Sequence, residues 1–166
     1  MFKCEKINEL IEIKAVMKKN DINNIWEYYN PNPPANDEEI ANIKDKGIVL
    51  DNEIIEFWKI CNGWSCFYQM VDLFGTKDII SERMNYANTI LKIEIDNQNE
   101  FENGQLMPIA LSREDMDIFA YVKYGNNVGK IIWYAGGEIE RFTSFSDFFV
   151  CMMEYCRADM YDLCSK

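Results

Sequence analysis

Apolar residues recur at helical spacing in the N-terminal third of the chain. Positions 7, 10, 11 and 14 to 17 predict an amphipathic helix within residues 1–17, with one apolar stripe formed by Ile7, Leu10, Ile11, Ala15 and Met17. Asp21 can cap a short second helix that runs through Trp26 and Tyr28. The prolines within residues 31–34 should end that helix, because proline cannot continue one.

Capping patterns predict two further helices. Asn36, followed three residues later by Glu39, is a variant of the capping box, and the helix that it opens should close at Gly47. Asp51 is positioned to cap the next helix, residues 52–61. The N-terminal third is therefore expected to be helical.

After Gly63 the pattern changes to aromatic and β-branched runs separated by turns. Residues 67–74 predict a strand and residues 76–88 a helix. Further strands are predicted at residues 90–95, 107–111, 117–124, 130–135 and 138–143. The last three follow one another across short glycine-containing turns, which is typical of an antiparallel meander.

The C-terminal segment carries one more amphipathic pattern. Its helical face consists of Phe145, Phe148, Phe149, Met152, Cys156, Met160 and Leu163. Ser144 or Ser146 can cap this helix, and its apolar face should pack on the sheet. The whole pattern predicts an α+β fold in a single domain, residues 1–166, with N-terminal helices, a mostly antiparallel sheet and a C-terminal helix packed on it.

The net charge of the chain limits the classes of function that it can have. The chain holds 17 Lys and Arg against 28 Asp and Glu, a formal net charge of -11, and such a surface repels the phosphate backbone, so direct nucleic-acid binding is not expected. The N-terminal residues lack the apolar core of a secretory signal, and no stretch approaches the ~20 apolar residues of a membrane span. We expect a cytoplasmic protein that does not engage membranes.

Residues typical of catalysis or metal binding are scarce. The chain has no histidine, the side chain most often used as a general base or metal ligand. The six cysteines should be reduced thiols, and the spacing within the pairs Cys61/Cys66 and Cys151/Cys156 does not fit a zinc site. Carboxylate pairs such as Glu138/Glu140 arise by chance among so many acids. We expect no enzymatic activity, no metal and no cofactor.

One charged segment remains as a candidate site. Residues 94–117 hold a single cation, Arg113, and net -6 from seven acids: Glu94, Asp96, Glu100, Glu102, Glu114, Asp115 and Asp117. A polar connector tolerates acids without any function. As a cluster, however, these residues are typical of a partner surface, because concentrated charge accelerates and orients the encounter with a basic protein.

The order of several short motifs resembles the SUKH superfamily of Smi/Knr-type domains over about residues 36 to 156. The similar segments are residues 50–64 with Asn62-Gly63, Leu106-Met107-Pro108-Ile109-Ala110, the strands at 117–124 and 130–134, and the Ser-Phe helix start at 143–149. The chain departs from the family pattern at Asn52, where proline is usual, at Ile54 or Ile55 in place of tyrosine, and at Met116 in place of glycine.

This resemblance implies a bacterial immunity protein that binds a cognate toxin domain, often a nuclease. Such toxins tend to be basic, which fits an acidic inhibitor. We expect the segment 94–117, with Glu138 or Glu140, to face the toxin, and Trp64 and Tyr68 to be aromatic anchors unless they are ordinary core residues. The protein should be a monomer or weak homodimer. The alternatives are a regulatory or scaffold module of the Smi/Knr cell-wall-regulator type and, more remotely, an uncharacterised enzyme.

Overall fold

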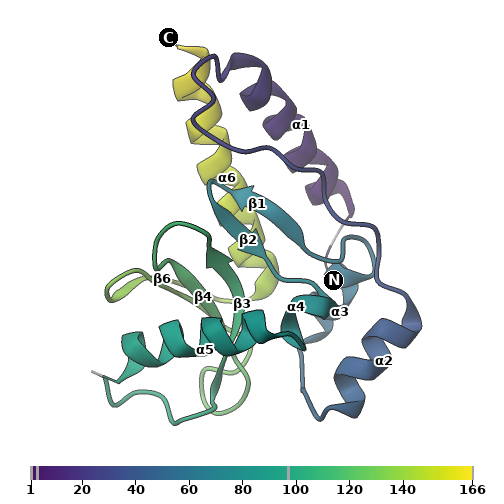
Figure 1. The fold of residues 1–166 in the computed structure, drawn as a ribbon, viewed down its shortest axis with the longest axis vertical. Coiled ribbons are helices and arrows are strands. Elements are labelled where there is room, and N and C mark those ends of the chain that lie inside the picture. Colours follow the sequence, from purple (N-terminus) through teal and green to yellow (C-terminus); the bar gives the residue numbers. More distant parts are fainter. Residues whose placement is uncertain (1, 3, 97, 166) are drawn as a thin grey trace.

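The computed structural model describes residues 2, 4–96 and 98–165 as an α+β fold (Figure 1). Met1, Lys3 and Asn97, which fall in segments predicted above, lie outside the described residues. The helices are α1 (Cys4–Asn20), α2 (Asp37–Asp45), α3 (Asn52–Trp58), α4 (Thr76–Ile79), α5 (Glu82–Ile95) and α6 (Phe145–Cys164). The strands are β1 (Trp64–Tyr68), β2 (Val71–Leu73), β3 (Leu106–Ser112), β4 (Ile118–Val122), β5 (Ile131–Tyr134) and β6 (Glu138–Phe142).

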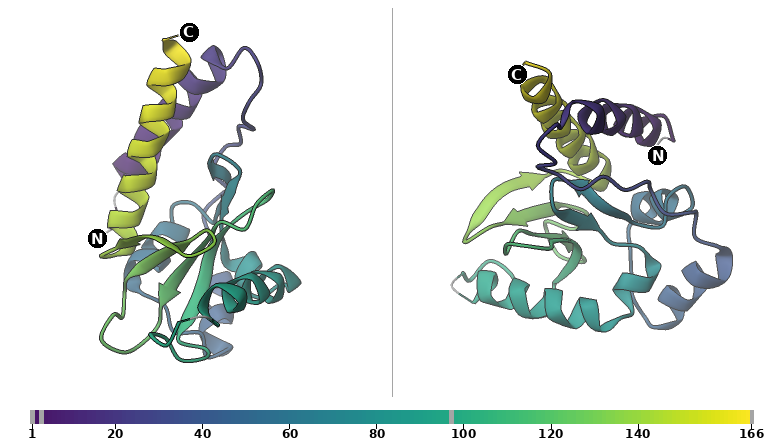
Figure 2. Two further views of the ribbon diagram at one scale, coloured as in Figure 1. Left: turned by 90° about the vertical axis from the view of Figure 1, so that its left-hand side faces the viewer. Right: turned by 45° about the horizontal axis from the view of Figure 1, so that its top comes forward.

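The six strands form one antiparallel sheet whose spatial order, β1-β2-β3-β4-β5-β6, is also their order along the chain. Every residue of β3 and β4 is buried, because these central strands are covered on both faces. Figure 2 shows α5 on one face of the sheet and α6 on the other, with α1 alongside α6. The predicted antiparallel meander is confirmed and extends over the whole sheet.

Aromatic residues join α6 to the sheet. The ring of Phe148 lies 5.7 Å from that of Phe67 on β1, 5.3 Å from that of Phe119 on β4 and 5.5 Å from that of Phe142 on β6, between ring centroids. Such edge and tilted ring contacts add to the apolar area that the rings bury. The predicted apolar face of the C-terminal helix is therefore confirmed, and Ser144 caps it by accepting a hydrogen bond from the Asp147 N–H.

The capping patterns of the two other helices are also confirmed. Asn36 and Glu39 form a full capping box at α2, and the Asp51 side chain accepts the N–H of Glu53 at the start of α3. The helix α1 buries Lys14 within its apolar stripe, where Nζ donates to the carbonyl oxygens of Cys66 at 2.6 Å and Phe67 at 3.3 Å. Burial lowers the pKa of Lys14.

The short second helix predicted from Asp21 is wrong, because residues 21–36 form a loop. The Asp21 carboxylate accepts the N–H of Ile25 at 2.9 Å, the N–H of Trp26 at 3.0 Å and the hydroxyl of Tyr28 at 3.0 Å. Asn24 adopts a positive φ of 49° within this segment. The side chain that was expected to cap a helix instead organises a turn, a competing use of aspartate.

Two strand predictions are also corrected. Residues 67–74 do not form one strand, because the chain reverses at Gln69, whose φ is 45°, and β2 pairs back onto β1. Residues 90–95 are not a strand but the last part of α5, in which Ile90 and Leu91 are buried against the sheet. Periodicity alone does not separate a short apolar strand from a buried helical turn.

Two glycines allow the end of α3 to approach the start of α4. A Cβ on Gly75 would lie 2.3 Å from the carbonyl oxygen of Asn62, and a Cβ on Gly63 would lie 2.6 Å from the Gly75 nitrogen. The Asn62 amide reinforces the contact, because its Oδ1 accepts the Thr76 N–H at 2.7 Å and its Nδ2 donates to the Thr76 hydroxyl at 2.8 Å. This junction leaves no room for a side chain at Gly75.

Candidate protein-binding surface

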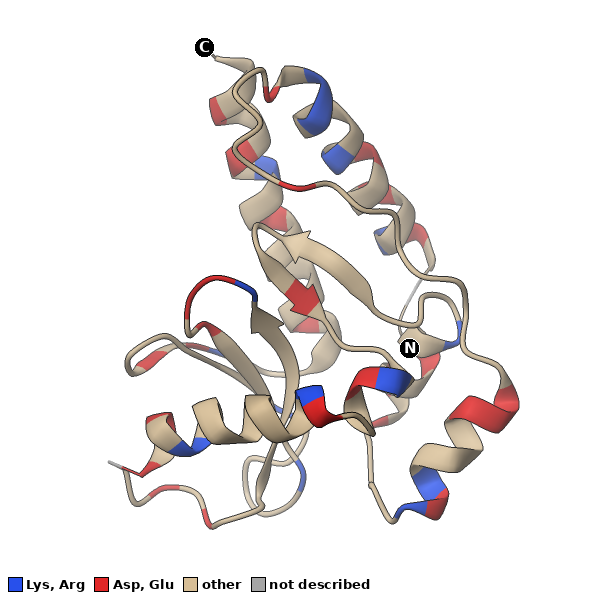
Figure 3. Ribbon diagram, in the orientation of Figure 1, with Lys and Arg blue, Asp and Glu red and all other residues tan. Residues whose placement is uncertain are grey.

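The predicted acids fall into two groups on the structure. The pairing of Leu111 with Ile118 and of Ile118 with Tyr134 places the β3–β4 turn and the β5–β6 turn side by side. Figure 3 shows acidic residues on the β3–β4 turn, on β6, at the end of α5 and on the connector that follows it. The acids at the end of the sheet formed by these two turns, together with those of β6, are called the acidic edge: Glu94, Glu114, Asp115, Asp117, Glu138 and Glu140.

The acids of the connector extend away from the acidic edge. Asn127 on the β4–β5 turn donates to Glu100 at 3.2 Å, and Gln105 accepts the N–H of Glu102 at 3.0 Å and donates to the carbonyl oxygen of Tyr124 at 2.8 Å. Asp96 lines a cavity together with Lys123 and Tyr124.

The centre of the acidic edge is formed by Glu94 and Asp117. The Glu94 carboxylate accepts the N–H groups of Gly136 at 2.9 Å and Gly137 at 2.8 Å, which ties α5 to the β5–β6 turn. Burial raises the pKa of Asp117, and the negative charges of Asp115 and Glu94 raise it further. Three acids from two elements thus lie close enough for their charges to interact.

Arg141 on β6 neutralises one part of the acidic edge. Its guanidinium donates to Glu100 at 2.6 and 2.9 Å and to Glu138 at 3.0 and 2.5 Å, and it stacks over the ring of Phe101 at 5.6 Å. The hydrogen bond from Arg141 lowers the pKa of Glu100. The two acids are therefore held in place, but their charge is partly compensated.

The remaining acids differ in how firmly they are held. Asp96, Glu102 and Glu114 are exposed on the connector and on the β3–β4 turn. Glu140 on β6 accepts a hydrogen bond from the hydroxyl of Tyr155 on α6 at 2.6 Å, and this bond is the main reason that the pKa of Tyr155 rises to about 12. The structure thus brings only part of the predicted acids together at the acidic edge, and it leaves the acids of the connector apart from them.

The two predicted aromatic anchors lie on β1, and Tyr68 is near the acidic edge, because its neighbour Tyr155 binds Glu140. Trp64 is 1% exposed, and its Nε1–H donates to the carbonyl oxygen of Tyr29 at 2.8 Å. Tyr68 is partly buried between the rings of Trp133 and Tyr155, at centroid distances of 6.3 and 6.1 Å. The position of Trp64 fits a core residue and not an accessible anchor, and Tyr68 offers only part of its ring.

A buried carboxylate that the sequence did not single out lies behind the acidic edge. Asp72 on β2 has a side chain 4% exposed, and it pairs with Arg113 and Arg83. It also accepts the N–H of Cys66 at 2.7 Å. Arg113 donates a further hydrogen bond to Glu27 at 3.1 Å. No local motif marks this cluster, because its members are far apart in the sequence.

Three of the six cysteines are placed as apolar core residues. Cys61, Cys66 and Cys156 are buried, and burial raises the pKa of Cys61 and of Cys156 to about 12, which disfavours the thiolate that nucleophilic catalysis needs. Among the described residues, no three His, Cys, Asp or Glu side chains are grouped so that they could hold a metal ion. Nor does any helix in the part of the chain that the structure describes have the length and apolar character to cross a bilayer.

Comparison with known proteins identifies the family of the chain. The family model described as SMI1 / KNR4 family (SUKH-1) matches residues 34–150. The comparison with curated proteins finds no match. The matched range begins just before α2 and ends in the first part of α6, so it includes the whole sheet and every residue of the acidic edge.

Proposed function

Because the chain belongs to the SMI1 / KNR4 (SUKH-1) family, we propose that it is an immunity protein that binds and neutralises a cognate toxin domain. Family membership indicates a role in protein–protein interaction. The proposed partner is a basic domain of the nuclease type, and the proposed mode of action is occlusion of its active or substrate-binding surface. The proposed site of action is the cytoplasm.

The observation that supports this proposal is the acidic edge. A toxin that acts on nucleic acid needs a positively charged groove for its polyanionic substrate. An inhibitor that presents carboxylates from three neighbouring elements can compete for the same groove, and its field accelerates the encounter. The free acids Glu114 and Asp115, with Asp117 beside them, are the residues that we propose to enter that groove.

The test uses binding and protection together. Candidate partners are small basic C-terminal domains of large secreted proteins encoded beside this chain. We expect such a domain to co-purify with the protein and to lose its toxicity when the two are co-expressed. If a candidate domain neither binds the protein nor is neutralised by it, the proposal fails for that pair.

A charge variant then tests the surface itself. Replacing Glu114→Gln, Asp115→Asn and Asp117→Asn should slow association and reduce its dependence on salt, because electrostatic steering acts mainly on the association rate. The matched control removes three exposed acids of α2, Asp37→Asn, Glu38→Gln and Asp45→Asn, and should change association much less. Equal effects of the two triple variants would show that net charge, and not the acidic edge, sets the rate.

A further inference from the structure

A second surface of opposite character lies beneath α5. A groove of about 1310 Å³ is lined by α5, the α2–α3 loop, the connector after α5 and the ends of β3 and β4. A smaller cavity of about 300 Å³ continues from it, and Gly47, Ile48 and Val49 line both. The main groove exceeds the roughly 300–1,000 Å³ of most small-molecule pockets, which favours a polypeptide occupant.

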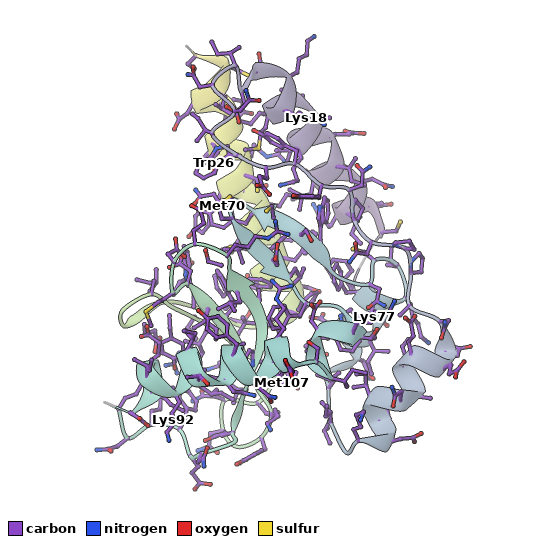
Figure 4. The ribbon with its side chains drawn as sticks, viewed as in Figure 1. Lys18, Trp26, Met70, Lys77, Lys92 and Met107 are labelled. Carbon is purple, nitrogen blue, oxygen red and sulfur yellow. The ribbon has the colours of Figure 1, made fainter. Side chains whose placement is uncertain are left out.

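The lining combines apolar side chains with lysines. The floor includes Leu91, Ile95, Phe101 and Met107, and at the rim Val49 is 71% exposed and Tyr124 46% exposed. Figure 4 labels Lys92 and Met107, which line the groove along α5. Exposed apolar residues around a concave apolar floor are typical of grooves that receive a partner's helix.

The charges of this lining stand out in a protein of net charge -11. Among the described residues, the two cavities are lined by three lysines, Lys44, Lys92 and Lys123, and by a single acid, Asp96. Each of the four arginines forms an ion pair, whereas within the described residues these three lysines form none. The ammonium groups along the groove are therefore available to an incoming carboxylate.

We propose that this groove binds a segment of a partner polypeptide that carries large apolar side chains together with acidic residues. The apolar side chains of the segment lie on the floor, and its carboxylates pair with Lys92 and Lys123. The segment thus has the opposite charge to the partner expected at the acidic edge. The groove proposal does not depend on the identity of that partner.

The experiment selects peptides from a random 12-residue library displayed on phage, with the full chain immobilised. We expect enrichment of sequences that combine aromatic or aliphatic residues with Asp and Glu. The best peptide, labelled with a fluorophore, is then titrated by anisotropy. The double variant K92E/K123E should weaken its binding by about tenfold or more, because it replaces two charge-assisted contacts by repulsion.

The matched control is K18E/K19E, which makes the same charge change on exposed lysines of α1. Figure 4 labels Lys18 at the opposite end of the molecule from Lys92. This control should retain peptide affinity within about twofold, the change expected from long-range charge alone at physiological salt. Thermal unfolding of both variants checks that the fold is intact.

Several outcomes would overturn the proposal. They are no enrichment, enrichment of basic peptides, unchanged affinity in K92E/K123E, or equal losses in the two double variants. Two further measurements test other occupants of the groove: sedimentation velocity detects a second copy of the chain, and a titration with laurate detects a long-chain carboxylate. A dimer that K92E/K123E abolishes would assign the groove to a second copy of the chain, and binding of laurate without any peptide would assign it to a long-chain carboxylate.

Discussion

Arg113 donates its Nε–H to both carboxylate oxygens of Asp72, at 3.0 and 2.8 Å, and so joins the β3–β4 turn to β2. The same guanidinium also binds Glu27 and stacks over the ring of Tyr29. Arg113 is the only cation within residues 94–117. Because Asp72 and Glu27 engage it, it leaves Glu114, Asp115 and Asp117 uncompensated, and this pairing helps to keep the acidic edge negative.

The variant Asp72→Asn tests how much this ion pair contributes to the stability of the fold. It should lower the free energy of unfolding by about 3 kcal/mol, because two guanidinium groups lose a buried partner. The control Glu27→Gln removes the other carboxylate that binds Arg113, but this side chain is 51% exposed, so we expect a loss of less than about 1 kcal/mol. Urea unfolding measures both, and equal losses would contradict the buried-pair argument.

The variant Arg141→Gln should act on the proposed function in the opposite direction to the loss of acids. It releases Glu100 and Glu138 from their shared cation and should speed association with a basic partner by about threefold at low salt. Arg157→Gln removes the same charge from an ion-paired arginine on α6 and should have a smaller effect. Stopped-flow association rates decide the comparison, and slower association of the Arg141 variant would count against the acidic edge.

The raised pKa of Asp117 predicts a pH-dependent stability difference. An acid whose pKa is higher in the folded state than its ordinary value of 3.8 costs stability once it is ionised, and the cost disappears as the pH falls below that ordinary value. Asp117→Asn should therefore be more stable than the parent at pH 7, and the difference should shrink to nothing in acid.

Thermal unfolding between pH 3 and pH 7, a range chosen to span the ordinary carboxyl pKa values of about 4, measures this difference. The control Glu102→Gln changes an exposed acid of the connector and should leave stability nearly unchanged across the range. A lower stability of Asp117→Asn at pH 7 would mean that its contacts outweigh the cost of burying the charge.

The close approach at Gly75 predicts that a side chain at this position destabilises the fold by steric clash and not by backbone strain. Its φ of -99° suits any residue, but Gly75→Ala would force a Cβ against the Asn62 carbonyl, and we expect a loss of about 3 kcal/mol or more. In Gly47→Ala the new Cβ has no neighbour within 4 Å. This variant should lose only about 1–2 kcal/mol of stability, because alanine disfavours the positive φ at this position. Chemical denaturation that ranks the two in reverse order would refute this account.

Features encoded by neighbouring residues were predictable from the sequence. The capping box of Asn36 and Glu39 and the meander depend on short spacings, and the order of motifs led to the family that the comparison confirms. The turn at Gln69 was missed because no glycine, proline or Asn-Gly pair marks it. The loop after Asp21 was missed because the same side chain can cap a helix or organise a turn.

The candidate surface was only partly predictable. The acidic residues of the segment 94–117 are visible in the sequence, and the position of Glu114, Asp115 and Asp117 beside the β5–β6 turn follows from the meander. The pairing of Arg141 with Glu100 bridges 41 positions, as does that of Arg113 with Asp72, and no local pattern encodes such contacts. The burial of Trp64 likewise depends on the loop that passes over it, whose Tyr29 carbonyl accepts the indole N–H.

The position of β6 at the edge of the sheet gives its charged residues a second role. As the terminal strand of the described sheet, β6 has an unpaired edge, and unpaired edges invite edge-to-edge aggregation with other chains. Three of its five residues are charged: Glu138, Glu140 and Arg141. An incoming strand would have to desolvate these charges, so Glu138 and Glu140 of the acidic edge, together with Arg141, also disfavour extended sheets between copies of the folded protein.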